Sequence, residues 1–232
     1  FHTQTAGCTL TAQQSDNNIV RVAVQTLAAT LGGTQSLHTN SRDEALALPT
    51  EESVRIALRT QQIIGYESGI ADTVDPLGGS YFVETLTDSI YAKAKKYIER
   101  IDELGGMVEA IEKGFVQQEV QDSAYNYQLE VEKGEQVVVG VNKFQMKEEP
   151  PMNLLKVDPS IQVSQIAKIN EVKADRDNDL VKKYLEEIKI TAQGTDNLMP
   201  KIVQAVKAYA TLGEITGTMQ EVFGEHKESV VL

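Results

Sequence analysis

Polar residues and one glycine gather at the ends of two short segments within the first 44 residues. They are Gln4, Thr5 and Gly7 in the first segment, and His38, Asn40 and Glu44 at the end of the second. Amide and carboxylate groups form hydrogen bonds in fixed directions, which suits the hydroxyl groups of an uncharged polyol or nucleoside. The pattern therefore predicts a ligand site. The alternative is that these polar groups only satisfy the backbone of the loops in which they lie.

Other catalytic motifs are absent from the sequence. None of the three histidines, His2, His38 and His226, has a partner histidine at metal-ligand spacing, so no metal site is expected. The motifs G-x-S-x-G, G-x-x-x-x-G-K and G-x-G-x-x-G do not occur. The single cysteine, Cys8, has no Lys or Arg within ten positions, which disfavours an activated thiolate. A thiol enzyme that uses Cys8 stays as one alternative.

The composition is that of an acidic globular protein. The 232 residues include 22 Lys+Arg and 34 Asp+Glu, so the formal net charge is −12. Nucleic-acid binding needs clustered positive charge and is therefore not expected. No apolar run approaches the roughly 20 residues that a membrane helix requires, so we expect no membrane partner.

The elements that must position the polar residues follow from the pattern of apolar residues. Residues 1–7 and 34–40 are predicted to be strands, residues 18–31 are predicted to be a helix, and a second helix is predicted to follow Pro49 and Thr50 and to run through Ile64. The helical stripes are Val20, Ala23, Val24, Leu27 and Leu31 in one helix, and Val54, Ala57, Leu58 and Ile64 in the other. This alternating order is typical of parallel α/β units. If the two strands belong to a parallel α/β barrel, their carboxyl ends face its active site.

The rest of the sequence is predicted to be mainly helical. The elements are a loop at 68–80, helices at 86–104 and 116–131, a buried strand at 137–141, and helices that begin after Asp158-Pro159. Lys147–Pro151 is polar and contains two prolines, which makes it the best boundary. The predicted segments are 1–68, 69–146, a linker at 147–157, and a helical segment at 158–232.

Four stretches make the sequence recognisable. They are FHTQTAGCTLTAQQSDNN, GGTQSLHTNSRDEALALPTEESVRIALRTQ, DPLGGSYFVE and VVVGVNKF. These stretches resemble the large catalytic subunit of the adenosylcobalamin-dependent acyl-CoA mutases, of which methylmalonyl-CoA mutase is the best-known member. The resemblance covers essentially the whole chain, and the TQSLHTN…DEALALPTE block is long and specific.

The resemblance implies an α/β fold, namely the last two β/α units of a TIM (β/α)8 barrel followed by a mainly helical C-terminal extension. FHTQTAG resembles the seventh barrel strand and TQSLHTN the eighth. In this family the acyl-CoA substrate lies along the barrel axis, and adenosylcobalamin covers the carboxyl-terminal face. Homolysis of the cobalt–carbon bond starts a radical migration of the carbonyl-CoA group to the neighbouring carbon.

By the same resemblance, individual residues acquire expected roles. Gln4, Asn40 and Glu44 would face the adenosyl ribose or the corrin edge, and Gly7 would let the backbone approach the corrin closely. Cys8 stands where some relatives carry a large aromatic side chain, and it is included in the predicted cofactor site. The predicted substrate-binding residues, on the side of the CoA channel, are Gln35 and Ser36.

The chain holds only part of what such a mutase needs. The first six barrel strands, with the residues that hold the thioester and the substrate carboxylate, are not in the sequence, so no catalytic residue is predicted. The D-x-H-x-x-G motif of the cobalamin-binding domain is also absent. We therefore expect a C-terminal piece that is inactive alone and pairs with the remainder of the barrel and with a separate cobalamin-binding domain or subunit. Cytoplasm is the default location, with the mitochondrial matrix as the other option.

The expected reaction is the interconversion of methylmalonyl-CoA and succinyl-CoA. Mutases of isobutyryl-CoA, 2-hydroxyisobutyryl-CoA and ethylmalonyl-CoA look alike over this region and remain alternatives. An alternative of another class is a non-catalytic scaffold that binds a partner subunit. Gln4, Asn40 and Glu44 speak against a scaffold, which has no need of polar strand ends around a cofactor.

Overall fold

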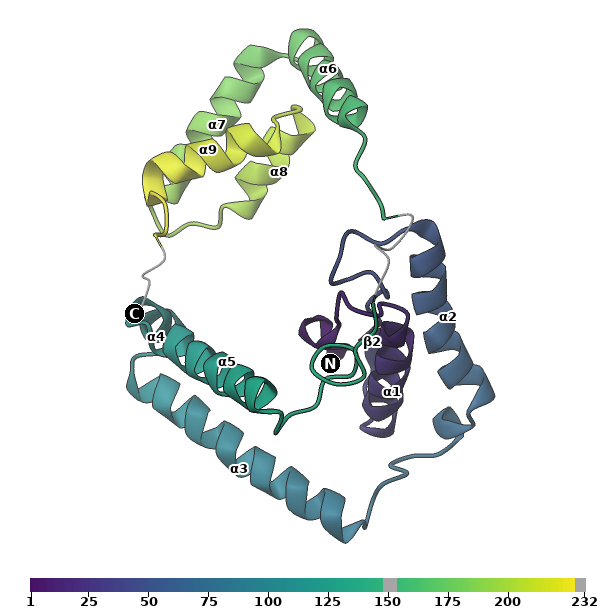
Figure 1. Cartoon of the computed structure of the whole chain (residues 1–232). Helices are drawn as coiled ribbons and strands as arrows, with labels where there is room; N and C mark the ends of the chain where they lie inside the picture. The colour runs from purple at the N-terminus through teal and green to yellow at the C-terminus, as the bar shows by residue number, and fades with distance from the viewer. Residues whose placement is uncertain (148–153, 228–232) are drawn as a thin grey trace. The chain divides into compact units, whose positions relative to one another are not determined.

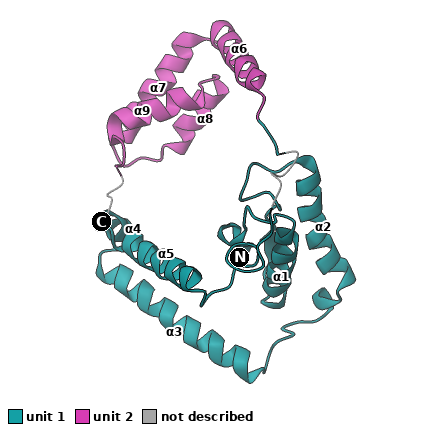
Figure 2. Ribbon diagram, viewed as in Figure 1, with its two compact units in different colours: residues 1–156, 230–232 teal, residues 157–229 magenta. Residues whose placement is uncertain are grey.

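The structure is a computed structural model that describes residues 1–147 and 154–227. The chain divides into two compact units, Phe1–Lys156 and a second one that begins at Val157 (Figure 2). The predicted boundary Lys147–Pro151 lies outside the described residues except for Lys147, as do residues 228–232 of the predicted C-terminal segment.

The first unit begins with two parallel strands, each followed by a helix (Figure 1). The elements are β1 (His2–Gln4), the 3-10 turn η1 (Gly7–Thr9), α1 (Asn17–Leu31), β2 (Ser36–His38) and α2 (Glu51–Glu67). In the parallel pair, His2 lies opposite Ser36 and Gln4 opposite His38. Helices α1 and α2 pack against each other. The predicted order of strands and helices is therefore confirmed, although both strands are shorter than predicted.

Hydrogen bonds continue the strand pairing beyond the ends of β1 and β2. The backbone N–H of Thr5 donates to His38 O at 3.0 Å. The Thr5 hydroxyl donates to Asn40 Oδ1 at 2.7 Å and accepts from the backbone N–H of Asn40 at 2.9 Å. Thr5 and Asn40 are both buried. These bonds replace regular strand pairing at the carboxyl ends, which explains why the strands end early.

The two faces of the strand pair differ in exposure. Thr3 and Leu37, at the centres of the two strands, are partly buried. The exposed residues on the other face are His2, Gln4, Ser36 and His38. One face of this small sheet is therefore covered within the described residues, and the opposite face is open.

The buried side of helix α1 is not the apolar stripe from which the helix was predicted. Its buried residues are Asn18, Val22 and Thr26. Val20 and Val24 are 63% and 60% exposed. The physical reason is that α1 is apolar on more than one side, so the pattern predicts a helix without predicting which side packs on α2.

Helix α2 shows the same preference for small and polar residues on its packed side. It buries Ser53, Ala57 and Thr60. The hydroxyl of Thr60 donates to Ile56 O at 3.0 Å within the helix, and Thr26 of α1 does the same to Val22 O at 2.7 Å. Such bonds satisfy buried hydroxyls inside their own helix. The helices can therefore pack through hydroxyl-bearing faces without unpaired groups.

In the described part of the first unit, three further helices follow α2. After η2 (Ile70–Asp72) come α3 (Tyr81–Glu103), α4 (Met107–Glu112) and α5 (Phe115–Lys133). The predicted helices at 86–104 and 116–131 are confirmed by α3 and α5. No residue of α3 is buried. In the part of the chain that the structure describes, no helix is long and apolar enough to cross a membrane.

The predicted strand at 137–141 is wrong. The segment forms a tight loop with only an isolated bridge between Val139 and Lys143. Gly140 has a left-handed backbone with φ +83, and its N–H donates to Lys143 O at 2.8 Å. The Asn142 side chain accepts from the Val138 N–H at 2.7 Å. The β-branched residues favoured a strand, but Gly140 and Asn142 supply the conformation and the hydrogen bond of a turn.

The second unit is a helical bundle. It contains α6 (Pro159–Asp175), α7 (Asn178–Ala192), α8 (Met199–Lys207) and α9 (Leu212–Phe223). The predicted helix start at Asp158-Pro159 is confirmed, since Asp158 accepts from the Ser160 N–H at 2.8 Å. Helix α7 packs against both α8 and α9. The buried residues between them are Val181, Ile188, Ala205, Ala210 and Ile215.

One partly buried ion pair holds the segments that lead into α7 and α9 together. Arg176, whose side chain is 6% exposed, binds both carboxylate oxygens of Glu214 at 2.7 and 2.6 Å and the carbonyl of Tyr209 at 2.7 Å. Glu214 also caps α9 by accepting from the N–H of Thr211 at 2.8 Å. The guanidinium of Arg176 holds the pKa of Glu214 well below its usual range.

Replacing Glu214 by Gln should destabilise α9 and its contact with α7 by roughly 1.5 to 3 kcal/mol, because the charge of Arg176 loses its partner. Since the pKa of Glu214 is lowered on folding, its contribution is fully present above about pH 4.5, the unperturbed value. That contribution is lost as the pH falls below this value toward the lowered pKa of the folded protein. Hydrogen exchange of the α9 amides between pH 7 and the acid range measures both effects.

Glu221→Gln is the matched control. Glu221 pairs with Lys189 at 2.7 Å, but its side chain is 62% exposed, so the change should cost under about 1 kcal/mol. Equal acceleration of exchange in the two variants would contradict the importance of the Arg176–Glu214 pair.

Replacing Thr5 by Val should loosen the carboxyl ends of the strands. Asn40 would keep a buried N–H and a buried amide oxygen without the Thr5 partner, at a cost of about 1 to 3 kcal/mol. Hydrogen exchange at residues 39–44 should accelerate accordingly. The control is Thr30→Val, because the Thr30 hydroxyl bonds only to Thr26 O in its own helix, at 2.9 Å. Unchanged exchange in the Thr5 variant would show that the pair does not hold the strand ends.

Candidate functional site

Four of the predicted cofactor-site residues lie together at the carboxyl ends of β1 and β2. A methyl group added at Gly7 would lie 3.0 Å from Asn40 Nδ2 and 3.2 Å from Glu44 Oε1. The Gln4 amide nitrogen lies 3.5 Å from Asn40 Oδ1. The structure therefore brings Gln4, Gly7, Asn40 and Glu44 into one group from two segments that are more than 30 residues apart.

The four residues differ in exposure and in hydrogen bonding, which shapes what the group can do. Asn40 is 2% exposed and is fixed by Thr5 through two hydrogen bonds. Gln4 and Glu44 are exposed at the strand ends. Gly7 has no side chain to separate its backbone from the amide of Asn40 and the carboxylate of Glu44. The arrangement offers one buried, hydrogen-bonded amide and two exposed polar groups, suited to hydroxyl and amide groups of a ligand.

Cys8 lies beside Gly7 in the turn η1 and is exposed. A single side chain of α1, Gln25, holds both ends of this turn. Its oxygen accepts from the Ala6 N–H at 2.7 Å and its nitrogen donates to Thr9 Oγ1 at 2.8 Å. Gln25 was not among the predicted site residues. The sequence did hold one signal for it: Gln25 is a polar residue inside the apolar pattern of the predicted helix 18–31, seven residues after Asn18.

The predicted substrate-side residues lie at the opposite end of the strand pair. Ser36 begins β2, and its hydroxyl bonds to His2 Nδ1 at 2.7 Å. Gln35 directly precedes it in the chain. The structure thus separates the two predicted sets along the strand direction, with Gln35 and Ser36 at the amino ends.

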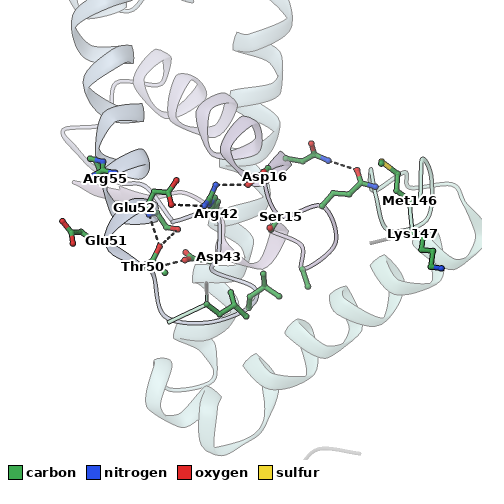
Figure 3. Close-up of a pocket in the computed structure, with 16 residues that line it drawn as sticks. Ser15, Asp16, Arg42, Asp43, Thr50, Glu51, Glu52, Arg55, Met146 and Lys147 are labelled. Carbon is green, nitrogen blue, oxygen red and sulfur yellow. Dashed lines mark hydrogen bonds and ion pairs between the residues drawn. The ribbon is translucent and has the colours of Figure 1, made fainter. Parts of the chain in front are cut away.

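A cavity of about 880 Å³ lies at the amino ends of α1 and α2 (Figure 3). None of the seven predicted site residues lines it. Arg42 forms two ion pairs in the cavity wall. Its Nη1 lies 3.0 Å from Asp16 Oδ1, and its Nη2 lies 3.7 Å from Glu52 Oε2. Asp43 accepts from the N–H of Thr50, the N-cap of α2, at 3.1 Å.

Arg42 pairs with two carboxylates and Asp43 accepts from a backbone N–H, so the cavity wall braces the loop from Asn40 to Thr50. Arg42 and Asp43 lie between Asn40 and Glu44 in the sequence. By tying this loop to the first turns of both helices, they hold the part of the chain that presents Glu44. We therefore place the candidate site at the strand ends and assign a supporting role to the cavity.

Comparison with known proteins identifies the family. The family model described as methylmalonyl-CoA mutase matches residues 1–225. The probable mitochondrial methylmalonyl-CoA mutase of Caenorhabditis elegans is 46% identical over 226 residues, which cover 97% of this chain and 30% of that protein. The mitochondrial enzyme of Bos taurus is 46% identical over 228 residues, with the same coverage of 97% and 30%.

A relative with a different substrate in its name is nearly as similar. The 2-hydroxyisobutanoyl-CoA mutase large subunit of Aquincola tertiaricarbonis is 42% identical over 233 residues, which cover 100% of this chain and 42% of that protein. The chain thus spans well under half the length of the curated relatives it matches. The resemblance predicted from the sequence is confirmed, and the chain belongs to the methylmalonyl-CoA mutase family.

Proposed function

We propose that this chain is the C-terminal part of the catalytic subunit of an adenosylcobalamin-dependent mutase that interconverts methylmalonyl-CoA and succinyl-CoA. Family membership and the names of the relatives at 46% identity support the reaction. The observation that carries the proposal is the meeting of Gly7, Asn40 and Glu44 at the carboxyl ends of two parallel strands. In parallel α/β barrels, catalytic sites lie at that end.

In this proposal β1 and β2 are the last two strands of a TIM barrel, within residues 1–68. Residues 69–146 wrap around the barrel, and 158–232 form a helical extension after a linker at 147–157. Among the described residues each strand is paired on one side only. Two strands cannot close a barrel, and unpaired edges need cover. The open sheet face and the exposed Val20 and Val24 on α1 are consistent with contact to the remainder of the barrel.

The residues at the strand ends fit adenosylcobalamin. Gln4, Asn40 and Glu44 would supply amide and carboxylate groups for ribose hydroxyls and corrin amides, and the missing side chain at Gly7 lets the Asn40 amide and the Glu44 carboxylate lie directly against its backbone. Cys8 would contribute a small, exposed side chain to the same surface. When bound, the cofactor supplies radical chemistry, while these residues hold and orient it and help exclude water.

On the substrate side, Gln35 and Ser36 would line the channel of the acyl-CoA at the amino ends of the strands. The groups that hold the thioester are proposed to lie in the remainder of the subunit. A separate cobalamin-binding domain or subunit completes the proposed assembly, and we propose that the isolated chain has no mutase activity.

The substrate has a specific second candidate. The 42% identical relative named for 2-hydroxyisobutanoyl-CoA matches the entire chain, so that substrate belongs in any test; isobutyryl-CoA and ethylmalonyl-CoA are further options of the same reaction type. A non-catalytic scaffold is the alternative of another class, and it would not need Gln4 and Glu44 exposed beside Gly7. The location is cytoplasm or mitochondrial matrix, the latter because two relatives are named mitochondrial.

The test uses the complete protein that contains this chain, together with its cobalamin-binding part. Formation of succinyl-CoA from methylmalonyl-CoA should depend on adenosylcobalamin and should exceed turnover of 2-hydroxyisobutyryl-CoA. Conversion of only 2-hydroxyisobutyryl-CoA would transfer the proposal to that substrate. If the complete protein neither binds adenosylcobalamin nor converts either substrate, the result would favour the non-catalytic scaffold.

Gly7→Ala should weaken adenosylcobalamin binding by about tenfold and should also lower the stability of the strand ends by about 1 to 3 kcal/mol. The new methyl group would lie 3.0 Å from Asn40 Nδ2, and Asn40 cannot yield because Thr5 fixes it. Gly7 does not have a left-handed backbone, so alanine brings no backbone strain. Absorbance titration of the complete protein with adenosylcobalamin measures the affinity.

Gly65→Ala is the matched control, because a methyl group there meets nothing within 4 Å. Gly65 lies in α2, where alanine favours the helix, so its affinity for adenosylcobalamin should not change. If the Gly7 variant binds as tightly as the control, the close approach at Gly7 is not part of the cofactor site.

A further inference from the structure

Asn18, in the first turn of α1, joins the two loops that follow β1 and β2. Its side chain is completely buried, with an exposed fraction of 0%. Its nitrogen donates to Thr11 O and to Arg42 O, both at 2.8 Å. Its oxygen accepts from the backbone N–H of Thr11 at 3.1 Å. Thr11 belongs to the loop after β1 and Arg42 to the loop after β2, so one amide bridges both.

The pattern of donors and acceptors requires an asparagine at this position. Arg21 NH1 donates to the same oxygen at 2.7 Å, so the oxygen faces two donors and the nitrogen faces two carbonyls. Aspartate would place an oxygen against both carbonyls, and an aliphatic side chain would remove the partner of three backbone groups, the N–H and C=O of Thr11 and the C=O of Arg42. The side-chain amide satisfies them completely.

Arg21 extends the bridge to a third segment. Besides Asn18, it donates to Thr11 Oγ1 at 3.0 Å and to Val139 O at 2.8 Å. Val139 belongs to the tight loop at 137–143, which lies 118 residues further along the chain. The guanidinium thus holds this distant loop, the loop after β1 and the Asn18 side chain in one arrangement.

Both loops that the Asn18 side chain joins carry residues of the candidate site close to the hydrogen bonds. Thr11 follows the turn that contains Gly7 and Cys8, and Arg42 lies between Asn40 and Glu44. Two hydrogen bonds of a single amide therefore help to set the separation between Gly7 and the Asn40–Glu44 segment, in addition to the bonds between Thr5 and Asn40. A change at Asn18 would alter that separation without touching any group in the site.

We propose that Asn18, supported by Arg21, is the positioning residue of the cofactor site, because it sets the separation of the two loops that carry Gly7 and Glu44. This inference rests on the proposed function. Asn18 itself does not contact the ligand. Its effect should therefore fall on cofactor affinity rather than on the binding of the acyl-CoA.

The test is Asn18→Asp in the complete protein. The new carboxylate keeps the bonds from the Thr11 N–H and from Arg21, which gains an ion pair and keeps α1 anchored, but it repels Thr11 O and Arg42 O. The dissociation constant for adenosylcobalamin, from absorbance titration, should rise at least about tenfold. The KM for the acyl-CoA should change by less than about threefold. Hydrogen exchange should accelerate at residues 8–12 and 40–46.

Two variants in the same helix serve as controls. Asn17→Asp makes the same chemical change one residue earlier, where the amide donates only to Gln14 Oε1 at 3.0 Å, and should alter cofactor affinity by less than about twofold. Thr26→Ala removes a buried hydroxyl that bonds only within α1. It should lower the stability of the helix with a change in affinity below about threefold.

Arg21→Lys is a second, milder variant for the case in which Asn18→Asp does not fold. Lysine keeps the charge but cannot reach Asn18, Thr11 and Val139 together, so cofactor affinity should fall about threefold. Unchanged affinity in the variant that folds would overturn the inference. An equal loss of adenosylcobalamin affinity in Thr26→Ala would also overturn the inference, because the affinity would then follow the stability of the helix. If the unaltered protein does not bind adenosylcobalamin, the proposed function fails, and that result is visible before any variant is made.

Discussion

The parallel register of β1 and β2, held at its carboxyl end by Thr5 and Asn40, is the constraint on which the rest of the site depends. Because side chains alternate along a strand, a slip of β1 by one residue would move Gln4 to the opposite face from His38, its present partner. It would also separate Asn40 from Thr5 and remove the amide that lies beside Gly7. The backbone bond from Thr5 to His38 O, at 3.0 Å, and the two side-chain bonds of Thr5 to Asn40 select this register.

Buried polar groups, rather than a large apolar core, organise the amino-terminal half of the first unit. Asn18, Thr26, Ser53 and Thr60 are buried between the helices and loops, and each has its hydrogen bonds satisfied within the chain. Such groups are costly unless every partner is present, so they specify one arrangement strictly. Apolar residues of the same helices remain exposed, which fits the proposal that further parts of a barrel cover them.

Local pattern predicted the order strand–helix–strand–helix, the helix start at Asp158-Pro159 and the grouping of Gln4, Gly7, Asn40 and Glu44. Each of these follows from short-range spacing or from the geometry of parallel strands. The pattern failed at 137–141, where Gly140 and Asn142 turn the backbone. It also could not indicate which side of α1 is buried, or that Gln25 and Asn18 hold distant loops. Those contacts depend on packing between segments far apart in the sequence, which periodicity does not encode.

A structure of the complete mutase with adenosylcobalamin bound is the most direct test of the proposal that these strand ends meet the cofactor. We expect β1 and β2 to pair with further strands on their free edges, and Gly7, Asn40 and Glu44 to contact the bound cofactor. A cofactor bound elsewhere, with these three residues facing solvent and the strand edges still unpaired, would contradict it.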